Sequence, residues 1–452
     1  YNFQNINEIL RRTPGVYTRE EGGFGLFPNI SLRGVSTLRS AKVTVMEDGI
    51  NIVPAPYSAP DAYYSPLAAK MSAIEVSKGS SQFRYGPHNT GGALNYITTP
   101  IDFGQRAFAS VSYGSFNDKQ THAYGNYGLT GSFGSFAILG EMYYRENDGY
   151  KDFNGTVDSE SYGDDNAGGL EQVAPMVKLL WQLPVSTPIT LELKGAYNGL
   201  DYDEGYTGLR DNDFNADPNK RYVASQLDNM NSNAYTYYSK LHIDPNDNIS
   251  NTTTFYYNQF ARDWYKLSNV GATGDMDSLT KVIARGHVET DDYNVLRGLT
   301  AGEVQYKSNN RTYYAYGIMN TTDLKFAHDF SGQRIEHDLK IGYKYHYDKI
   351  DREQYKSTYS QAVGGALTGQ GSVFDADRTQ TSKGHVFFFE EAAKVDKLTF
   401  KLGSRLEILE GHYRKGGTGA VTNYDKEKTY AFVPGGGLVY DHNANLKFFG
   451  GV

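Results

Sequence analysis

Arginine is the residue type in this sequence best suited to hold an anionic ligand, because its guanidinium group forms paired hydrogen bonds with a carboxylate. The candidate arginines, which lie in or next to the expected long connecting loops, are Arg210, Arg221, Arg262, Arg285, Arg297, Arg352, Arg378 and Arg414. Among these, the predicted ligand-binding residues are Arg285, Arg297, Arg352 and Arg378.

Three tyrosines form a second group of candidate ligand contacts, close to a proline-rich segment at residues 54–60. The prolines restrict the backbone of this segment, so it could present Tyr57 to a ligand in a fixed position. Tyr63 and Tyr64 follow a few residues later and belong to the same predicted site. The alternative is a rigid turn that binds no ligand.

Acidic segments weaken the case for an anionic ligand and leave room for a cationic one. Residues 146–170 are rich in Asp and Glu and contain Lys151 as their one basic residue. This composition leaves open a cationic cargo, such as nickel or a metal–chelator complex. Residues 211–217 resemble the start of a calcium loop, but Ala216 and Tyr222 stand where that loop needs Gly and Glu. We expect solvated loops, or divalent bridges to lipopolysaccharide, rather than a calcium site.

The histidines and the missing motifs predict neither a metal site nor a catalytic centre. The scattered candidates are His242, His287, His346, His385 and His412, none in a ligand-spaced pair. The sequence lacks the His-Glu-x-x-His, Gly-x-Ser-x-Gly and phosphate-loop motifs. It contains no cysteine, and therefore no thiolate metal site and no disulfide.

Composition narrows the class of protein. The chain has 452 residues and a formal net charge of -8, which argues against a nucleic-acid binder. It has no apolar run of about 18 residues, so no transmembrane helix is expected. Aromatic residues nevertheless make up 14% of the chain. A membrane β-barrel is compatible with these features, because only alternate residues of its strands face lipid.

Long strands with alternating polar and apolar residues are expected from about Gln105 onward. In one of them, apolar Leu193 is flanked by charged Glu192 and Lys194, a period of two that is typical of a strand with one apolar face. Such runs suit the ~9–11 residues that cross a bilayer at a tilt. The connectors between them are alternately long and short, as in outer-membrane barrels.

Aromatic residues near the strand ends predict the interfacial girdles of such a barrel. The candidates are Tyr143-Tyr144, Tyr256-Tyr257, Tyr313-Tyr314 and Trp264. The alternative is that the tyrosines are simply good strand formers.

The first hundred residues have short apolar runs that end at Gly, Asp or Pro, which predicts a compact α+β region. Ser-Leu-Arg-Gly-Val at 31–35, Met-Glu-Asp-Gly-Ile at 46–50, Ile-Glu-Val-Ser-Lys-Gly at 74–79 and the glycine-rich segment 85–98 follow in order. Together these motifs resemble the plug of TonB-dependent outer-membrane receptors. Residues 53–57 are further similar to the branch of that family that imports ferric citrate.

The resemblance implies an all-β transmembrane barrel of antiparallel strands, about 22 when complete, with an N-terminal α+β plug domain in its lumen. We place the plug at residues 1–104 and the barrel at residues 105–452. About 13 strands are expected in the latter, whereas bacterial barrels close with an even number. We therefore expect strands to be missing at the C-terminal end. Because the sequence begins at Tyr1 without a signal peptide or the family's energy-coupling segment, we expect it to be truncated at the N-terminal end as well.

The resemblance also implies energy-coupled import across the outer membrane of a Gram-negative bacterium. The cargo would be a ferric chelate, most simply ferric citrate or a siderophore, carried as a ligand without a resident cofactor. The implied partners are the TonB energy-coupling complex and outer-membrane lipid and lipopolysaccharide, with no nucleic acid. The residues expected to form a charged network that holds the plug in the barrel are Arg33, Glu75, Lys78 and Arg84.

Three rival interpretations stay open. Import of nickel or another chelate would use the same architecture. A passive porin, or a surface adhesin or phage receptor, would belong to a different functional class. The motifs of the expected plug argue against the porin.

Overall fold

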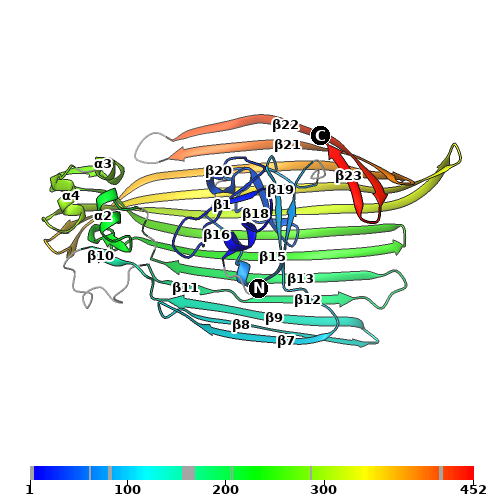
Figure 1. The fold of residues 1–452 in the computed structure, drawn as a ribbon, viewed down its shortest axis with the longest axis horizontal. Coiled ribbons are helices and arrows are strands. Elements are labelled where there is room, and N and C mark those ends of the chain that lie inside the picture. The colour runs from blue at the N-terminus through cyan, green and yellow to red at the C-terminus, as the bar shows by residue number, and fades with distance from the viewer. Residues whose placement is uncertain are drawn as a thin grey trace.

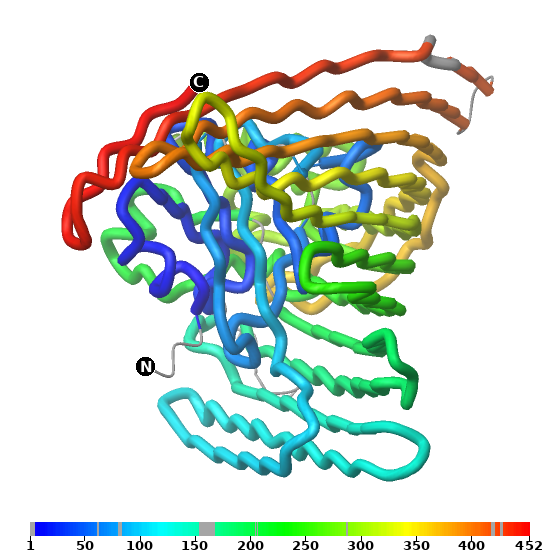
Figure 2. Tube along the Cα trace, turned by 90° about the vertical axis from the view of Figure 1, so that its right-hand side faces the viewer, coloured from blue at the N-terminus to red at the C-terminus, as the bar shows by residue number. Residues whose placement is uncertain are grey.

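The computed structural model describes residues 5–60, 63–79, 84–154, 168–203, 205, 207–285, 288–416 and 421–452. A large antiparallel sheet, which we call the wall, curves around the N-terminal part of the chain (Figures 1 and 2). The N-terminal part lies where the sequence predicts a plug, and we refer to residues 5–98 as the plug. In the described residues, no helix is long and apolar enough to cross a membrane.

The plug is an α+β unit. Its elements are α1 (Ile6–Leu10), β1 (Val16–Arg19), β2 (Asn29–Leu32), η1 (Leu38–Ser40), β3 (Val43–Glu47), β4 (Ile50–Asn51), η2 (Ala68–Lys70), β5 (Met71–Ser77) and β6 (Gly92–Thr98). β1 pairs with β2, and the other strands form a sheet in the order β4-β3-β6-β5. β3 and β4 are joined by Asp48 and Gly49, which both have positive φ, as a two-residue hairpin turn of this sequence requires.

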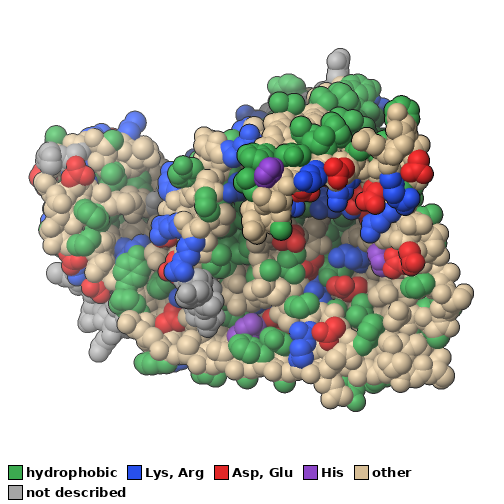
Figure 3. Space-filling view, turned by 45° about the vertical axis from the view of Figure 1, so that its right-hand side comes forward, with side chains coloured by type: hydrophobic (Ala, Val, Ile, Leu, Met, Phe, Trp, Pro, Cys, Tyr) green, Lys and Arg blue, Asp and Glu red, His purple; other side chains and the backbone are tan. Residues whose placement is uncertain are grey.

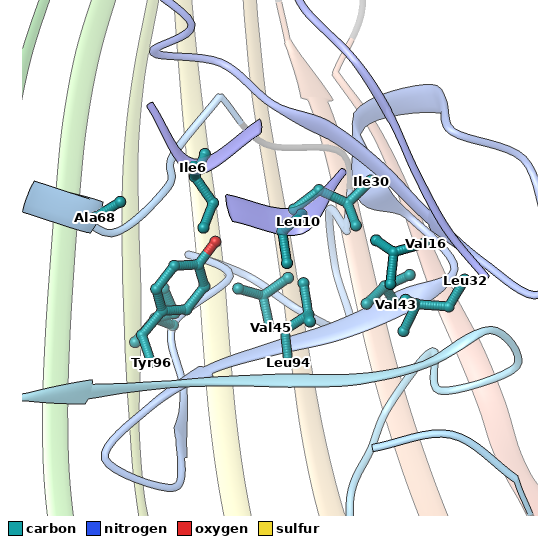
Figure 4. Packing of buried hydrophobic residues seen from close by; sticks show 11 residues of the cluster. Ile6, Leu10, Val16, Ile30, Leu32, Val43, Val45, Ala68, Leu94 and Tyr96 are labelled. Atoms are coloured by element: carbon teal, nitrogen blue, oxygen red, sulfur yellow. The ribbon is translucent and has the colours of Figure 1, made fainter. Parts of the chain in front are cut away.

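The core of the plug is built from the short apolar runs. Leu10 of α1, Leu32 of β2 and Leu94 of β6 are almost completely buried and converge with Val45 of β3 between the helix and the sheet (Figure 4). Burial of a leucine side chain contributes roughly 1.5–3 kcal/mol, so this cluster stabilises the plug as a unit.

The wall follows the chain order, each strand pairing antiparallel with the next. Its strands are β7 (Gln105–Tyr113), β8 (Lys119–Gly131), β9 (Gly134–Asn147), β11 (Leu170–Val173), β12 (Met176–Gln182), β13 (Ile189–Tyr202), β15 (Asn229–Asn246), β16 (Ile249–Ala272), β18 (Gly302–Phe330), β19 (Gln333–Gln361), β20 (Leu367–Val395), β21 (Leu398–Gly416), β22 (Thr422–Asn443) and β23 (Leu446–Gly451). β11 and β12 together fill one position between β9 and β13. Within the described residues, the edge strands β7 and β23 do not pair with each other.

The two faces of the wall differ as the alternating pattern predicts. Leu193 lies on the outer face, whereas the neighbouring Lys194 is buried against the plug. Tyr257 and Tyr316 are paired across β16 and β18 and are partly exposed on the outer face, which fits an aromatic girdle. The prediction is wrong for Trp264, whose ring is buried and lies on Phe27 of the plug. It is also wrong for Tyr143, Tyr256 and Tyr313, which are buried on the inner face.

The strands extend further than the sequence predicts. Arg352 and Arg378, predicted in a long connecting loop, lie instead within β19 and β20, and only residues 362–366 link these two strands. The hydrophobic alternation disappears where both faces of a strand meet water, although the backbone pairing continues. Sequence periodicity therefore reports the lipid-facing part of a strand and not its end.

The remaining helices and short strands gather at one end of the wall, at the left of Figure 1. They are β10 (Asp152–Asn154), α2 (Asp211–Ala216), β14 (Lys220–Tyr222), η4 (Val223–Ser225), β17 (Asp275–Ser278), α3 (Leu279–Ala284) and α4 (Asp291–Leu296). Val282, Leu296 and Tyr306 are buried at the centre of this group. We call the described residues 207–228, 273–285 and 288–301 the cap.

Candidate functional site

Four arginines form a continuous row across the inner face of the wall. Arg262 of β16 pairs with Arg311 of β18, Arg311 with Arg352 of β19, and Arg352 with Arg378 of β20. Residues that are directly opposite in antiparallel strands project to the same face, with Cβ atoms about 4.5–5.5 Å apart. We call these residues the arginine layer, and like charges at this spacing repel one another.

The arginine layer has no salt-bridge partner in the part of the chain that the structure describes. Within the described residues, no carboxylate forms a salt bridge with any of the four arginines, and each has a buried Nε atom without a hydrogen-bond partner. Gln380 accepts one hydrogen bond from Arg352 Nη2 at 3.1 Å. A row of guanidinium groups with unused donors is suited to bind a ligand that carries several carboxylates.

The plug reaches the arginine layer at its Arg262 end. The guanidinium group of Arg262 lies 5.2 Å from the centre of the Tyr63 ring, and that of Arg39 lies 4.3 Å from the same ring. Tyr63 also meets Trp264 edge-on, at 4.8 Å between the ring centres. The predicted contact Tyr63 therefore lies next to the arginine layer. Tyr64 packs instead against Phe260, which is two residues before Arg262 on β16.

Beneath the arginine layer, a second row of residues supports the plug segment 54–60, which we call the apex loop. This row consists of Phe260, Tyr313, Ile350 and Gln380, again paired strand to strand. Ala55 and Ala59 of the apex loop are buried against its apolar members. The apex loop is closed by a hydrogen bond of 2.8 Å from Ala59 N to Ala55 O.

A third row holds the tip of the apex loop through Asp348. This fully buried carboxylate accepts hydrogen bonds from Tyr57 N at 2.7 Å and from Ser58 N at 3.1 Å. It also accepts one from Ser58 Oγ, which lies 2.9 Å from Ser382 Oγ and can accept a hydrogen bond from that hydroxyl. Asp348 and Ser382 are directly opposite each other on β19 and β20, so two neighbouring strands hold one loop tip.

Tyr57 points along the wall rather than away from it. Its ring lies 5.5 Å from that of His346, and it packs against Gly384, where a Cβ atom would come within 3.3 Å of the ring. Its hydroxyl is buried, and burial together with the nearby Glu407 raises the pKa of this group. Whether Tyr57 touches a ligand stays a prediction.

The body of the plug holds the apex loop from the other side. His88 Nε2 lies 2.8 Å from Pro56 O. Burial lowers the pKa of His88, so the ring is neutral near pH 7 and donates through Nε2–H. The carbonyl of the Pro56–Tyr57 peptide is thus bound to the plug, while the N–H of the same peptide and the N–H of Ser58 are bound to the wall.

A second contact between plug and wall consists of buried ion pairs. Lys194 Nζ lies 2.5 Å from a carboxylate oxygen of Glu47 and 2.7 Å from one of Asp48, and Lys178 approaches Asp48 at 3.9 Å. Burial alone would raise the pKa of Asp48, but the two lysines outweigh that effect and hold it far below its usual value. Figure 3 shows a hollowed face of the molecule on which acidic and basic side chains lie close together.

Further polar contacts join the plug to the wall on either side. Lys70 donates to Ala174 O at 3.1 Å and lies 3.7 Å from Glu141 of β9. On the opposite side, Arg405 of β21 donates to Tyr85 O and to Asn89 Oδ1. The plug is therefore attached to the wall through charged groups at several points.

The predicted network residues lie elsewhere on the plug. Arg33 is exposed, and Glu75 accepts a hydrogen bond from Asn95 at 2.8 Å. Lys78 donates to Pro14 O, and Arg84 to the neighbouring Tyr85. The structure does not bring these four residues together in one network, and each contact that it records for Glu75, Lys78 and Arg84 is within the plug.

The predicted arginines divide into two groups. Arg352 and Arg378 belong to the arginine layer, whereas Arg285 and Arg297 lie in the cap. Arg285 forms salt bridges with Asp277 and Asp292, and Arg297 lies 3.8 Å from Glu289. Arg285 and Arg297 are thus paired with carboxylates, unlike the described contacts of the arginine layer.

The acidic segments have structural partners where they are described. Residues 211–216 form helix α2, in which Asp213 accepts hydrogen bonds from the hydroxyls of Tyr222 and Tyr293. This arrangement is not that of a calcium loop. His287 and most of the acidic stretch 146–170 lie outside the described residues.

Comparison with protein families decides the class of the molecule. Residues 1–93 match the TonB-dependent receptor plug domain, and residues 181–452 match the β-barrel of TonB-dependent receptors. The chain belongs to the TonB-dependent receptor family. The predicted fold class, a β-barrel with an N-terminal plug, is confirmed, and the chain is not an enzyme.

Solved structures of this family resemble the chain over almost its whole length. The unliganded ferric citrate transporter FecA has a TM-score of 0.76 at 19% identity, covering 99% of this chain and 60% of its own. The siderophore receptor PiuA from Acinetobacter baumannii has a TM-score of 0.69 at 16% identity, covering 99% and 62%. The ferric-catecholate receptor Fiu from E. coli K12, in its open form, has a TM-score of 0.65 at 15% identity, covering 99% and 66%.

A curated relative with a different cargo also matches part of the chain. The vitamin B12 transporter BtuB of Vibrio cholerae serotype O1 is 32% identical over 114 residues, which are 25% of this chain and 18% of BtuB. The chain thus spans less than a fifth of this relative and somewhat under two thirds of the three solved structures.

Sequence reasoning missed Arg311 and Asp348 in this TonB-dependent receptor. Each lies in a polar stretch of a strand, where the sequence gives it no distinguishing feature. Its role depends on which residue lies opposite it on the next strand. The signal that was available is the alternation itself: a charged residue that alternates with outward apolar residues must face the lumen, as Lys194 does.

Proposed function

We propose that this receptor imports an anionic ferric chelate across the outer membrane of a Gram-negative bacterium, and that ferric citrate is its best candidate cargo. The observation that carries the proposal is the arginine layer, whose four guanidinium groups have no carboxylate partner among the described residues. Carboxylates of the chelate would bind there, beside Tyr63 of the plug. The iron complex is the cargo, and the proposal includes no resident cofactor.

Energy for import would come from the TonB complex acting on the plug. The plug is attached to the wall by buried charged contacts, which can be exchanged for water when the plug moves. An apolar seal of the same area would expose hydrophobic surface instead. Lipid and lipopolysaccharide would surround the outer face of the wall.

The similarity to solved structures supports a ferric cargo without defining it. FecA, PiuA and Fiu are described as ferric citrate, siderophore and ferric-catecholate receptors. Catecholate complexes of iron and ferric citrate are both anionic, so both suit a row of arginines. Nickel would not, which makes it the weaker alternative, and a neutral corrinoid would gain little from four guanidinium groups.

Alanine substitutions in the full-length receptor test this proposal. A hydrogen bond to a charged group contributes about 1.5–3 kcal/mol. Arg311→Ala, Arg352→Ala and Arg378→Ala should therefore each weaken ferric citrate binding roughly tenfold to a hundredfold. Binding is measured by titration of the purified receptor, with a ferric catecholate complex, cyanocobalamin and nickel as competing cargoes.

Arg285→Ala is the matched control, since this arginine is already neutralised by Asp277 and Asp292. Equal losses in Arg285→Ala and Arg352→Ala would move the site from the arginine layer to the cap. Tight binding of nickel, with no effect of any arginine on ferric citrate, would contradict the proposal.

A further inference from the structure

Two histidines meet on the outer face of the wall, at the end opposite the cap. His328 is near the end of β18 and His337 near the start of β19, and the turn at residues 331–332 folds one strand back on the other. His328 shares the outer face with Tyr316, because residues an even number of positions apart on a strand project to the same side. His337 lies on that face too, since it is directly opposite Phe326 of β18.

The two rings approach each other through one nitrogen each. His337 Nε2 lies 3.0 Å from His328 Nδ1, and the ring planes are within 17° of parallel. The other nitrogen of His337, Nδ1, lies 2.6 Å from a carboxylate oxygen of Glu391 on β20. Phe326 stacks on the His337 ring at 4.5 Å between the centres. His337 is therefore held in place from two sides, whereas His328 is exposed to solvent.

Glu391 determines which nitrogen of His337 can bind a cation. A carboxylate only accepts hydrogen bonds, so the proton of neutral His337 is on Nδ1 and the lone pair is on Nε2, toward His328. A carboxylate in this position also makes the other nitrogen more basic, which is the usual arrangement behind a metal-binding histidine. His328 can turn its Nδ1 lone pair toward the same point when its own proton moves to Nε2.

The separation of the two nitrogens favours a particular coordination geometry. With metal–nitrogen bonds of about 2.0–2.1 Å, two ligands at a right angle are about 2.9 Å apart, and two at the tetrahedral angle are about 3.3–3.4 Å apart. The observed 3.0 Å is nearer the right-angle value, which belongs to the tetragonal sites of Cu(II) and Ni(II) rather than to tetrahedral zinc. Of these divalent ions, copper is bound most tightly.

We propose that His328 and His337 bind a divalent copper ion on the outer face of the wall, with Glu391 as the positioning residue behind His337. In the described part of the chain, no three His, Cys, Asp or Glu side chains converge to hold a metal. The two histidines would therefore supply two ligands, and water would occupy the other positions. The bound ion would link β18 to β19 and, through Glu391, to β20. None of these three residues belongs to the plug or to the arginine layer, so the inference does not depend on the proposed cargo.

Copper titration of the full-length receptor in detergent tests the site. Copper(II) chloride is added alone, the affinity is measured by calorimetry, and the number of nitrogen ligands is read from electron paramagnetic resonance. Glu391→Ala should weaken binding about tenfold to a hundredfold while two nitrogens stay bound. Glu391→Gln should recover part of that loss, because its amide oxygen can accept the same hydrogen bond without the charge. His328→Ala and His337→Ala should each weaken binding more than Glu391→Ala and leave one nitrogen ligand.

His242→Ala is the matched control. The Nε2 atom of His242 also lies near a carboxylate, 3.1 Å from Asp244, but Nδ1 lies 2.8 Å from the hydroxyl of Thr252 instead of a second histidine. This variant should bind copper as the parent does. Without metal, His328→Ala should unfold at the same temperature as the parent, since His328 is exposed. Copper should raise the unfolding temperature of the parent but not that of His328→Ala.

Several results would overturn the proposal. If the parent binds no copper through two nitrogens, the rings are only a hydrogen-bonded pair. Equal losses in His242→Ala and His328→Ala would mean that copper binds to single histidines. Tighter binding of zinc than of copper at the pair would replace the tetragonal site with a tetrahedral one. Arg352→Ala should bind copper as the parent does, and a loss there would place the ion at the arginine layer instead.

Discussion

Substitution of Lys194 should destabilise the receptor strongly, because its fully buried ammonium group pairs with two carboxylates of the plug. Lys194→Met keeps the length of the side chain but leaves Glu47 and Asp48 buried with less countercharge. Breaking a buried ion pair in this way costs about 3–5 kcal/mol. We expect this loss in the free energy of unfolding of the receptor, measured by denaturant titration in detergent.

Lys281→Met is the control for that measurement. Lys281 is 70% exposed and pairs with Asp277 in the cap at 3.4 Å, so its removal should cost less than about 1 kcal/mol. Similar costs for the two variants would show that the contact of Lys194 with the plug has no special weight.

The acid sensitivity of the plug follows from Asp48. Its folded-state pKa lies below the unfolded value of about 4. The ionised carboxylate therefore contributes stability above that pH, and this contribution is lost as the pH falls through the folded pKa. We expect constant stability from neutral pH down to about pH 5 and a steep loss below about pH 4, measured by unfolding at a series of pH values.

Lys194→Met should move this loss to higher pH, because Asp48 loses the larger of its two stabilising charges. An unchanged acid profile in this variant would mean that other carboxylates dominate the acid response.

The cap has a hydrophobic core of its own, so we expect a substitution in that core to destabilise the cap but not the wall. Leu296 of α4 is fully buried, and truncation of such a leucine costs about 2–5 kcal/mol. Leu296→Ala should therefore open the cap to proteases while the wall stays resistant. The neighbouring Leu299, 51% exposed, supplies the control: Leu299→Ala should be cleaved no faster than the parent.

The facing of the strand residues and the presence of the plug could be predicted from the sequence, whereas the arginine layer could not. The outward position of Leu193 and the inward position of Lys194 follow from alternation alone, and the plug follows from its motifs. The arginine layer does not, because it depends on the register between four strands whose separation in sequence is set by connectors of unequal length. Arg352 and Arg378 were predicted as loop residues, since the alternation ends before the strands do.

The contacts between plug and wall could not be predicted from the sequence either. The predicted residues Glu75 and Lys78 carry the right charges, but they bind within the plug. Asp48, which does reach the wall, stands in a two-residue turn whose Asp-Gly sequence is already explained by its backbone conformation. Because the turn already explains why an aspartate stands at position 48, the sequence gives no sign that its carboxylate pairs with Lys194 of the wall.

The long connectors that form the cap lie at one end of the wall, and short turns such as the one between β15 and β16 lie at the opposite end (Figure 1). In outer-membrane barrels the short turns face the periplasm. Asn215 in α2 and Asp247 in the β15–β16 turn are both exposed. A cysteine at position 215 should react with a membrane-impermeant maleimide on intact cells, and one at position 247 should react only after lysis.

Equal labelling of both positions on intact, unbroken cells would contradict this orientation. Labelling of position 247 alone would reverse it and would place the cap, together with the arginine layer next to it, on the periplasmic side.

The rows of the inner wall have a consequence for how such receptors diverge. The arginine layer and the residues that hold the apex loop belong to separate rows of the same strands, and the sheet is held together by backbone hydrogen bonds that no side chain provides. On the proposed function, substitutions confined to the uppermost row would change the cargo that is bound and leave the rows under the apex loop, and the backbone pairing of the sheet, unchanged.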